Sequence, residues 1–166
     1  MRSVVAAVVL CVALVLTAVP AAAVGEFSLG SWSGAAYFKD GKFFRCAMRA
    51  RYINGWDLFF SIDPAGYFSV LLRSQRIDML GEMLFGTKVA LRMQIDDTPL
   101  VVRPFTAISP QLIETKFATN LDFVQRLSTG KVLRVNSGSK VWRFPLTDAK
   151  EAMPLLHACA AKYRNG

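Results

Sequence analysis

Apolar and polar residues alternate along much of the chain with the two-residue period of β-strands. The clearest run is Thr87–Asp96, in which Val89, Leu91, Met93 and Ile95 alternate with polar or small residues. One face of such a strand is buried and the other faces water. Similar runs predict strands over residues 31–38, 43–52, 56–62, 67–73, 87–96, 100–107, 112–117, 131–136 and 140–146. The pattern therefore predicts a mainly β domain, built as an antiparallel sandwich or a barrel-like meander.

Turn signals separate the predicted strands. Asp40-Gly41 and Asn54-Gly55 are favoured in two-residue hairpins, because these residues accept the positive φ angles of such turns. Ser137-Gly138-Ser139 is expected to join the last two strands as another hairpin. Pro104 cannot donate a hydrogen bond to a neighbouring strand, so it favours an edge strand or a bulge at 100–107.

Two helices are expected beside the strands. A short one is predicted after Thr119-Asn120, with Gly130 just past its end. A longer C-terminal helix is predicted from Asp148, where Glu151 stands at the position of a capping-box partner. Pro154 removes one backbone hydrogen bond, so this helix is expected either to kink or to begin near Pro154 itself.

The first 23 residues have the pattern of an export signal. Arg2 precedes an apolar run, Val4–Val19, and Pro20 and the small residues Ala21 and Ala23 follow it. This order is typical of a signal peptide cleaved after Ala23. A retained membrane anchor is the alternative, but the run is short for a bilayer span of about 20 residues. We predict a signal peptide over 1–23, one β-rich domain over 24–166 without a transmembrane anchor, and a periplasmic or secreted location.

Removal of the signal peptide leaves two cysteines, Cys46 and Cys159. In an oxidising compartment, a pair of cysteines in a small domain predicts one disulfide. The bond would fasten the C-terminal helix to the strand predicted over 43–52, in which Phe44, Cys46, Met48 and Tyr52 alternate on the expected core face. Chain-entropy arguments give up to about 4–5 kcal/mol of stability for closing so long a loop.

No group of residues in the sequence points to catalysis. His157 is the only histidine, and both remaining cysteines are assigned to the disulfide, so a zinc site is not indicated. Asp96-Asp97 with Asp63 or Glu82 could form a pair of catalytic carboxylates, but acidic residues at turns usually serve turn geometry. We therefore predict a non-enzymatic protein that needs no cofactor.

Basic residues give the main indication of function. The formal net charge is +8 at pH 7. Arg45, Arg49 and Arg51 fall on the outward face of one predicted strand, and Lys88 and Arg92 fall on that of another. If the two strands are neighbours, these residues form a stripe that would attract an anionic envelope component or another protein. The alternative is a solvated face that keeps the protein in solution, and export disfavours nucleic acid as a partner.

The strand predicted over 56–62 is apolar on both faces, with Trp56, Leu58 and Phe60 on one and Phe59 on the other. This composition fits a strand buried centrally between sheet and helix. It also fits a barrel that lines an apolar pocket. A carrier of a small apolar ligand such as a lipid is therefore the alternative function.

The C-terminal pattern also resembles that of a known family. The resemblance rests on the spacing of Phe144, Leu146, Ala152, Leu156 and Cys159, together with an early Phe-x-x-Cys stretch at residues 43–46. In these two stretches the chain resembles the invasion-associated locus B family of small exported proteins from alphaproteobacteria. The resemblance implies a β-sandwich or barrel-like domain with a disulfide, no catalysis and a role in envelope or host-contact biology.

Overall fold

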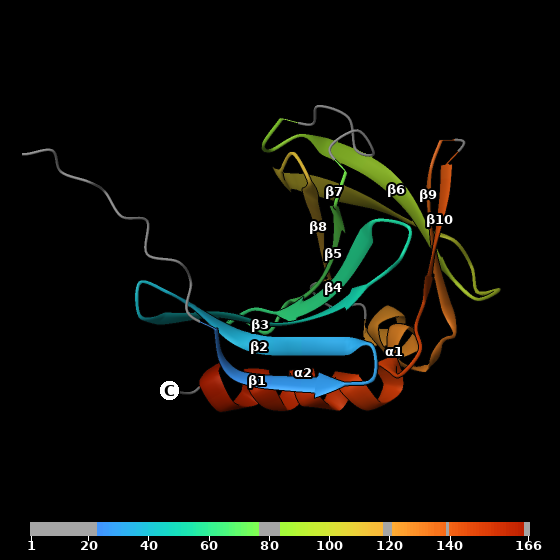
Figure 1. Cartoon of the computed structure of the whole chain (residues 1–166). Helices are drawn as coiled ribbons and strands as arrows, with labels where there is room; N and C mark the ends of the chain where they lie inside the picture. Colours follow the sequence, from blue (N-terminus) through green and yellow to red (C-terminus); the bar gives the residue numbers. More distant parts are fainter. Residues whose placement is uncertain (1–22, 77–83, 118–120, 139, 165–166) are drawn as a thin grey trace, which may run out of the picture.

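The computed structural model describes residues 23–76, 84–117, 121–138 and 140–164. In this part of the chain, ten strands form one antiparallel sheet and two helices pack against it (Figure 1). The prediction of a mainly β antiparallel fold with one short helix and a C-terminal helix is confirmed. The strands are β1 (Ala23–Leu29), β2 (Trp32–Lys39), β3 (Lys42–Arg51), β4 (Trp56–Ile62), β5 (Phe68–Ser74), β6 (Lys88–Ile95), β7 (Val101–Ser109), β8 (Leu112–Phe117), β9 (Val132–Ser137) and β10 (Lys140–Pro145); the helices are α1 (Leu121–Thr129) and α2 (Ala149–Arg164).

The order of strands in the sheet is β1-β2-β3-β4-β5-β8-β7-β6-β9-β10. The first five strands form the predicted meander, in which each strand pairs with the next. β5 then pairs with β8, and β6 pairs with β9. Between β5 and β9, the strands β8, β7 and β6 therefore lie in the reverse of their order along the chain. The sheet is strongly curved (Figure 1), with β1 and β10 as its two edges, and it does not close into a barrel.

One face of the sheet carries the hydrophobic core. Trp56, Leu58 and Phe60 of β4 are completely buried there, and Trp56 packs against Trp142 with ring centres 5.1 Å apart. Burial of each such side chain stabilises the fold by about 1.5–3 kcal/mol. α2 packs against β1 to β4, and neither described helix has the length and apolar character needed to cross a bilayer. β4 is thus the centrally buried strand that its apolar composition suggested.

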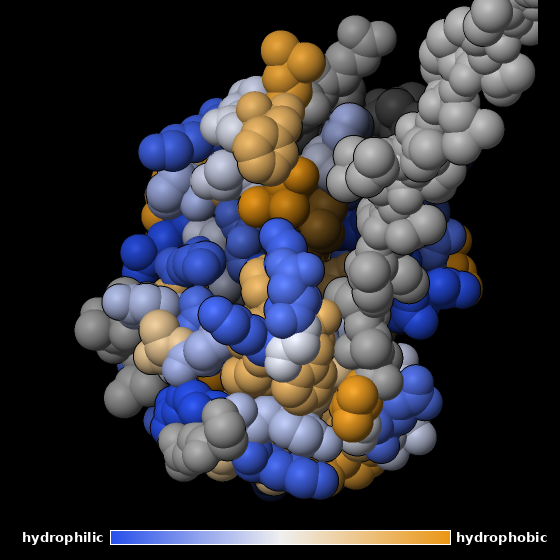
Figure 2. All heavy atoms as spheres, turned by 90° about the vertical axis from the view of Figure 1, so that its left-hand side faces the viewer, coloured by the Kyte–Doolittle hydropathy of each residue, from blue (hydrophilic) through white to orange (hydrophobic). Residues whose placement is uncertain are grey.

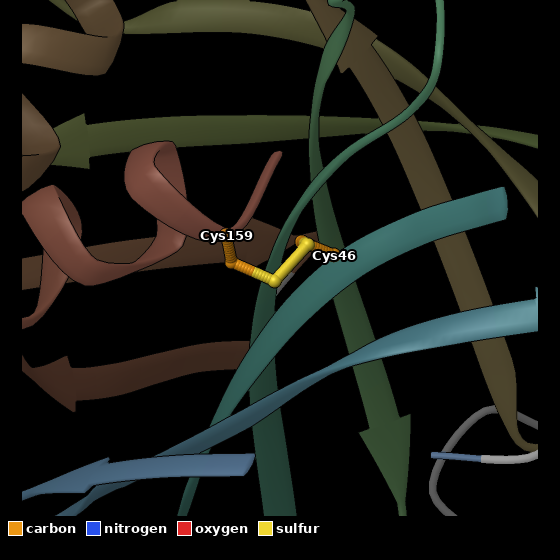
Figure 3. Close-up of a disulfide and its surroundings, with 2 residues drawn as sticks. All are labelled: Cys46 and Cys159. Atoms are coloured by element: carbon orange, nitrogen blue, oxygen red, sulfur yellow. A yellow bond between two sulfur atoms is a disulfide. The ribbon is translucent and has the colours of Figure 1, made fainter. Parts of the chain in front are cut away.

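The predicted disulfide joins β3 to α2. Cys46 and Cys159 are bonded across 113 residues, with their Cα atoms 6.1 Å apart (Figure 3). Cys46 is completely buried and Cys159 is 8% exposed, so the bond lies within the core. The hairpin predicted at Asp40-Gly41 is confirmed as well, because both residues have positive φ angles, 52° and 74°. Only the glycine adopts such an angle without steric cost.

β1 was not expected from the alternation of residue types. Its pairing with β2 shifts register between Val24 and Phe27, so its apolar residues do not follow a two-residue period. The predicted signal peptide over 1–23 lies outside the described residues except for Ala23, which pairs with Tyr37. The described part of the chain therefore leaves the export signal a prediction.

The expectation that Phe44 points into the core is wrong. The β2–β3 pairing shifts register between Tyr37 and Phe38, and Phe43 instead packs on the core. A bulge adds one residue to a strand and so reverses the faces of the residues beyond it. Phe44 is consequently 42% exposed.

For two prolines, the structure excludes one of the two expected alternatives. β7, which contains Pro104, lies between β6 and β8, so it is not an edge strand, and its pairing with β8 shifts register between Ala107 and Ser109. Its pairing with β8 ends at Thr106, however, so Pro104 has a paired neighbour on one side only. α2 runs through Pro154 from Ala149, which excludes a start near Pro154. The helix tolerates this proline at an exposed position in its second turn.

Candidate functional site

The face of the sheet opposite the core is rich in basic side chains. Directly paired residues on neighbouring antiparallel strands point to the same face. One row of such pairs runs from β3 to β6 through Arg49, Phe59, Leu71, Glu114, Thr106 and Lys88. We call this side of the sheet the basic face. Between Arg45 and Arg143, its described strand positions hold nine basic side chains against two acidic ones: Arg45, Arg49, Arg51, Arg73, Lys88, Arg92, Lys116, Arg134 and Arg143 against Asp57 and Glu114. Nearer the β1 edge, Lys39 and Lys42 add two cations and Glu26 adds a third carboxylate, because their neighbours Phe38, Phe43 and Phe27 pack on the core.

All five basic residues singled out in the sequence lie on this face, but they do not form one stripe. β3, with Arg45, Arg49 and Arg51, is separated from β6, with Lys88 and Arg92, by four other strands. Strands are about 4.8 Å apart, so the two groups lie roughly 24 Å apart measured along the sheet. The condition for a stripe on adjacent strands is therefore not met. The structure places the five residues within a broader basic surface.

A buried carboxylate occupies one end of the basic face. Asp57 of β4 is completely buried and lies directly between Arg51 of β3 and Arg73 of β5. Its carboxylate accepts hydrogen bonds from Nε of Arg73 at 2.9 Å and from Nε2 of Gln75 at 3.0 Å, and Nε of Arg51 lies 3.5 Å away. Arg51 and Arg73 thus compensate a buried negative charge. Their first role is structural.

Arg45 is also paired with a carboxylate, that of Glu114, which lies three strands away in the sheet. Its Nη1 lies 3.2 Å from Oε1 of Glu114 on β8, so the side chain reaches past β4 and β5. Ser61 and Ser69, which are small and buried, occupy those two strands, and Ser61 lies 3.5 Å from Nη1. The guanidinium also stacks on Phe44, 4.4 Å from the ring centre. Arg45 and Glu114 are only 19% and 8% exposed, so this ion pair is part of the packed structure.

The other basic residues are more open to solvent. Lys116 and Arg134 make longer ion pairs with Asp63 and Asp97, at 3.4 and 3.5 Å. Such exposed pairs contribute little to stability and exchange readily with other anions. Within the described residues between Arg45 and Arg143, four basic side chains of this face have no carboxylate partner: Arg49, Lys88, Arg92 and Arg143. These four are the side chains best placed to meet an anion from outside.

Two hollows open on the basic face. The first has a volume of about 410 Å³ and lies over β1 to β4. Arg49, Glu26, Tyr37 and Phe59 line it, together with small residues such as Ala35 and Ala47. The second, of about 440 Å³, lies between β7 and β8 and includes Lys88 and Lys116. Seen from the left-hand side of Figure 1, the surface combines hydrophilic residues with smaller apolar patches (Figure 2).

Other residues considered for chemistry have structural roles or lie apart. Asp63 accepts a hydrogen bond from the backbone N–H of Tyr67 at 2.9 Å, which is a turn contact. Asp96 accepts from the backbone N–H groups of residues 131 and 132. His157 is exposed on α2, and Glu82 lies outside the described residues. No cluster of three or more metal-binding side chains occurs within the described ranges.

The residue that follows β3 is hydrogen-bonded to the end of β10, the strand at the other edge of the sheet. The phenol of Tyr52 donates a hydrogen bond to the carbonyl oxygen of Pro145 at 2.7 Å. Burial raises the pKa of Tyr52 well above its ordinary value, because ionised phenolate is poorly solvated there. Trp32 makes a second such contact, with its Nε1 donating to the carbonyl oxygen of Thr147 at 2.8 Å.

The sequence could indicate which residues face outward, but not which of them carry ion pairs. The partners Asp57 and Glu114 lie on strands distant in sequence from Arg45 and Arg51. Four further residues of the basic face were missed for a related reason: Arg73, Lys116, Arg134 and Arg143. Each is one of few basic residues on its strand, so no single strand showed a cluster.

The sequence matches no protein-family model and no curated protein. A solved structure, that of invasion associated protein B from Bartonella henselae, is similar to this chain with a TM-score of 0.59. The match covers 84% of this chain and 99% of that one, at 18% sequence identity. Similarity at this identity establishes a shared fold. The chain is therefore a distant structural relative of that protein, in keeping with the resemblance noted in its C-terminal sequence.

Proposed function

We propose that this chain is an exported, non-enzymatic binding protein whose basic face contacts an anionic macromolecule of the cell envelope. The observation that carries the proposal is the imbalance of eleven basic against three acidic side chains on one side of a single sheet. Two of the acidic side chains, Asp57 and Glu114, are already matched by arginines. The excess positive charge therefore faces outward.

Several features support an address outside the cytoplasm. The disulfide between Cys46 and Cys159 is of the kind that persists in oxidising compartments. The N-terminal sequence has the order of a cleaved signal peptide. The name of the structural neighbour associates that protein with invasion, which supports a role at the envelope or cell surface for this chain. We infer a periplasmic or secreted location from these three observations.

The chemistry of the face sets what the partner should be. An extended polyanion, such as an acidic polysaccharide, can contact basic groups roughly 24 Å apart, which a small ligand cannot. Such contacts are electrostatic and solvent-exposed, so they should weaken as salt is added. The alternative, a carrier of an apolar ligand, gains no support from the two hollows, because both have basic residues in their walls.

The test uses immobilised heparin as a model acidic polysaccharide. Arg45 and Arg51 should not be replaced for this purpose, because loss of Arg45 would leave Glu114 unpaired and loss of Arg51 would leave Asp57 with Arg73 as its one arginine partner. The variant Arg49→Ser/Arg92→Ser/Arg143→Ser instead removes three charges that lack a carboxylate partner. We expect about tenfold weaker binding at low salt, equivalent to about 1.4 kcal/mol shared by three screened charges.

The matched control removes three basic residues that lie off the basic face, in Lys131→Ser/Lys150→Ser/Lys162→Ser. Both triple variants have the same net charge, so a difference between them reports the position of the charge. We expect the control to bind heparin clearly more tightly than the face variant does. Its affinity should lie within about twofold of the value expected from the loss of three net charges alone. Equal weakening of the two variants would contradict a localised binding face.

A further inference from the structure

Two strands in the middle of the sheet separate part-way along their length. β7 and β8 pair at Ser109–Leu112, Ala107–Ile113 and Thr106–Glu114, and their pairing stops there. Residues 101–105 of β7 stay paired with β6, and residues 115–117 of β8 stay paired with β5. Pro104, which has no N–H group, lies in the separated part of β7. A crevice therefore opens within the sheet, and we call it the β7–β8 crevice.

The β7–β8 crevice is large enough for a small ligand. Its volume is about 440 Å³. It opens on the basic face, where Lys88 of β6 and Lys116 of β8 line it. It extends between the strands to Arg103 and Thr115, whose paired neighbours Leu91 and Val70 face the core. Its polar lining consists of Lys88, Arg103, Thr106, Glu114, Thr115 and Lys116.

The charge inside the crevice is positive. Lys88, Arg103 and Lys116 contribute three cations, and Glu114 is the one carboxylate among the lining residues. The Glu114 carboxylate is already engaged by Arg45 at 3.2 Å. Lys116 shares its charge with Asp63 at 3.4 Å, and its side chain is 54% exposed and free to reorient. At least two positive charges therefore remain uncompensated among the groups that line the crevice.

Arg103 supplies a second, independent indication. Its Nε is buried and has no hydrogen-bond partner among the residues that the structure describes. The guanidinium lies 5.1 Å from the ring centre of Phe117, a contact that holds its plane in place. A buried donor without an acceptor costs free energy, and an oxygen atom of a bound ligand would remove that cost. The group is thus positioned as a donor for an acceptor that the described part of the chain does not supply.

We propose that the β7–β8 crevice binds a phosphate group. A phosphate carries up to two negative charges and several acceptor oxygens, which match three cations and the hydroxyl groups of Thr106 and Thr115. Pro104 and Ile108 complete the lining with apolar surface, which suits an organic moiety attached to the phosphate. The site shares Lys88 and Lys116 with the basic face, but it takes a small group and not a polyanion, so the two proposals are tested separately.

Isothermal titration of the disulfide-intact protein with inorganic phosphate tests the site directly. We expect one binding site in the unaltered protein. Lys88→Ala and Arg103→Gln should each weaken binding by about tenfold, because each removes a charge-assisted hydrogen bond. Lys88→Arg keeps the charge and should bind nearly as well. Absence of phosphate binding by the unaltered protein would overturn the proposal.

The matched control is Arg143→Ala, which removes an exposed cation of the basic face on β10, away from the crevice. It should bind phosphate like the unaltered protein. Equal loss in Arg143→Ala and Lys88→Ala would indicate general charge attraction and would also overturn the proposal. Thermal unfolding of each variant verifies that it is folded. A failure here leaves the heparin experiment unaffected, because that variant retains both Lys88 and Arg103.

Vesicles identify the source of the phosphate group. Phosphatidic acid exposes a phosphomonoester at the vesicle surface, and phosphatidylcholine does not. Stronger binding to phosphatidic acid vesicles that is lost in Lys88→Ala/Arg103→Gln would assign the site to a lipid headgroup. Binding of inorganic phosphate without that preference would assign it to a soluble phosphomonoester. Either result supports a phosphate site. A preference for phosphatidic acid that persists in Lys88→Ala/Arg103→Gln would count against a phosphate site in the crevice.

Discussion

β3 and β6 look alike in sequence, because both alternate buried residues with outward basic ones. In the structure the basic residues of β3 and β6 do different things. Arg45 and Arg51 of β3 hold the buried carboxylates of Glu114 and Asp57. Lys88 of β6 is exposed and, like Arg92, has no carboxylate partner within the described residues. The same outward pattern therefore serves the fold on one strand and remains open to a partner on the other.

The surroundings of the two strands explain the difference. β3 carries the disulfide to α2, packs against that helix, and is followed directly by Tyr52, which bonds to Pro145. β6 lies between β7 and β9, outside the set of strands that α2 covers. Changes around β3 should therefore act on stability, and changes on β6 should act on binding.

The largest effect is expected from removal of the Asp57 carboxylate, which pairs with Arg51 at the end of β3 and with Arg73 of β5. Asp57→Ala leaves Arg51 and Arg73 without the buried charge that they compensate. We expect a loss of about 3–5 kcal/mol in the free energy of unfolding, measured by denaturant titration. Asp97→Ala is the control, because Asp97 is fully exposed although it also pairs with an arginine. Equal shifts of the two midpoints would contradict a structural role for the Asp57 cluster.

Removal of the disulfide should have the next largest effect. Cys46→Ser/Cys159→Ser frees α2 from β3, and we expect a loss of about 2–4 kcal/mol on unfolding. The comparison is made with the oxidised protein under identical conditions. Reduction of the unaltered protein should lower its stability by a similar amount. No change in either case would show that packing of α2 suffices without the covalent bond.

A pair of single variants compares β3 and β6 directly. Arg45→Ser leaves the largely buried Glu114 unpaired and should cost about 2 kcal/mol. Lys88→Ser removes an exposed cation and should change the free energy of unfolding by less than about 0.5 kcal/mol. The two variants lose the same charge from the same face. Similar destabilisation in both would remove the distinction between the strands.

The smallest effect is expected from the hydrogen bond between Tyr52 and the carbonyl oxygen of Pro145. Tyr52→Phe removes one hydrogen bond and should cost about 1 kcal/mol at neutral pH. The raised pKa of Tyr52 in the folded state means that the unfolded chain loses this proton first as pH rises. Stability of the unaltered protein should therefore fall as the pH rises above about 10. The phenylalanine variant should show a smaller decline over the same range, and an identical decline would rule out this contribution.

Local features of the fold could be predicted from the sequence, and non-local ones could not. Alternation located nine strands, because one face of each meets the core, and Asp40-Gly41 specified its hairpin through positive φ angles. The pairing of β5 with β8 depends on how the whole sheet packs over the core, and no local sequence pattern specifies it. β1 and Phe44 were misjudged because bulges break the period. The ion pair of Arg45 and Glu114 depends on that same strand order.

Hydroxyl-radical footprinting with heparin tests most directly whether the basic face is the binding surface. Phe44, Val102 and Val141 are 42%, 57% and 55% exposed on or beside this face, and His157 is exposed on α2. We predict that heparin protects the first three side chains from oxidation and leaves His157 unchanged. Protection of His157, with Phe44, Val102 and Val141 as reactive as before, would contradict the account.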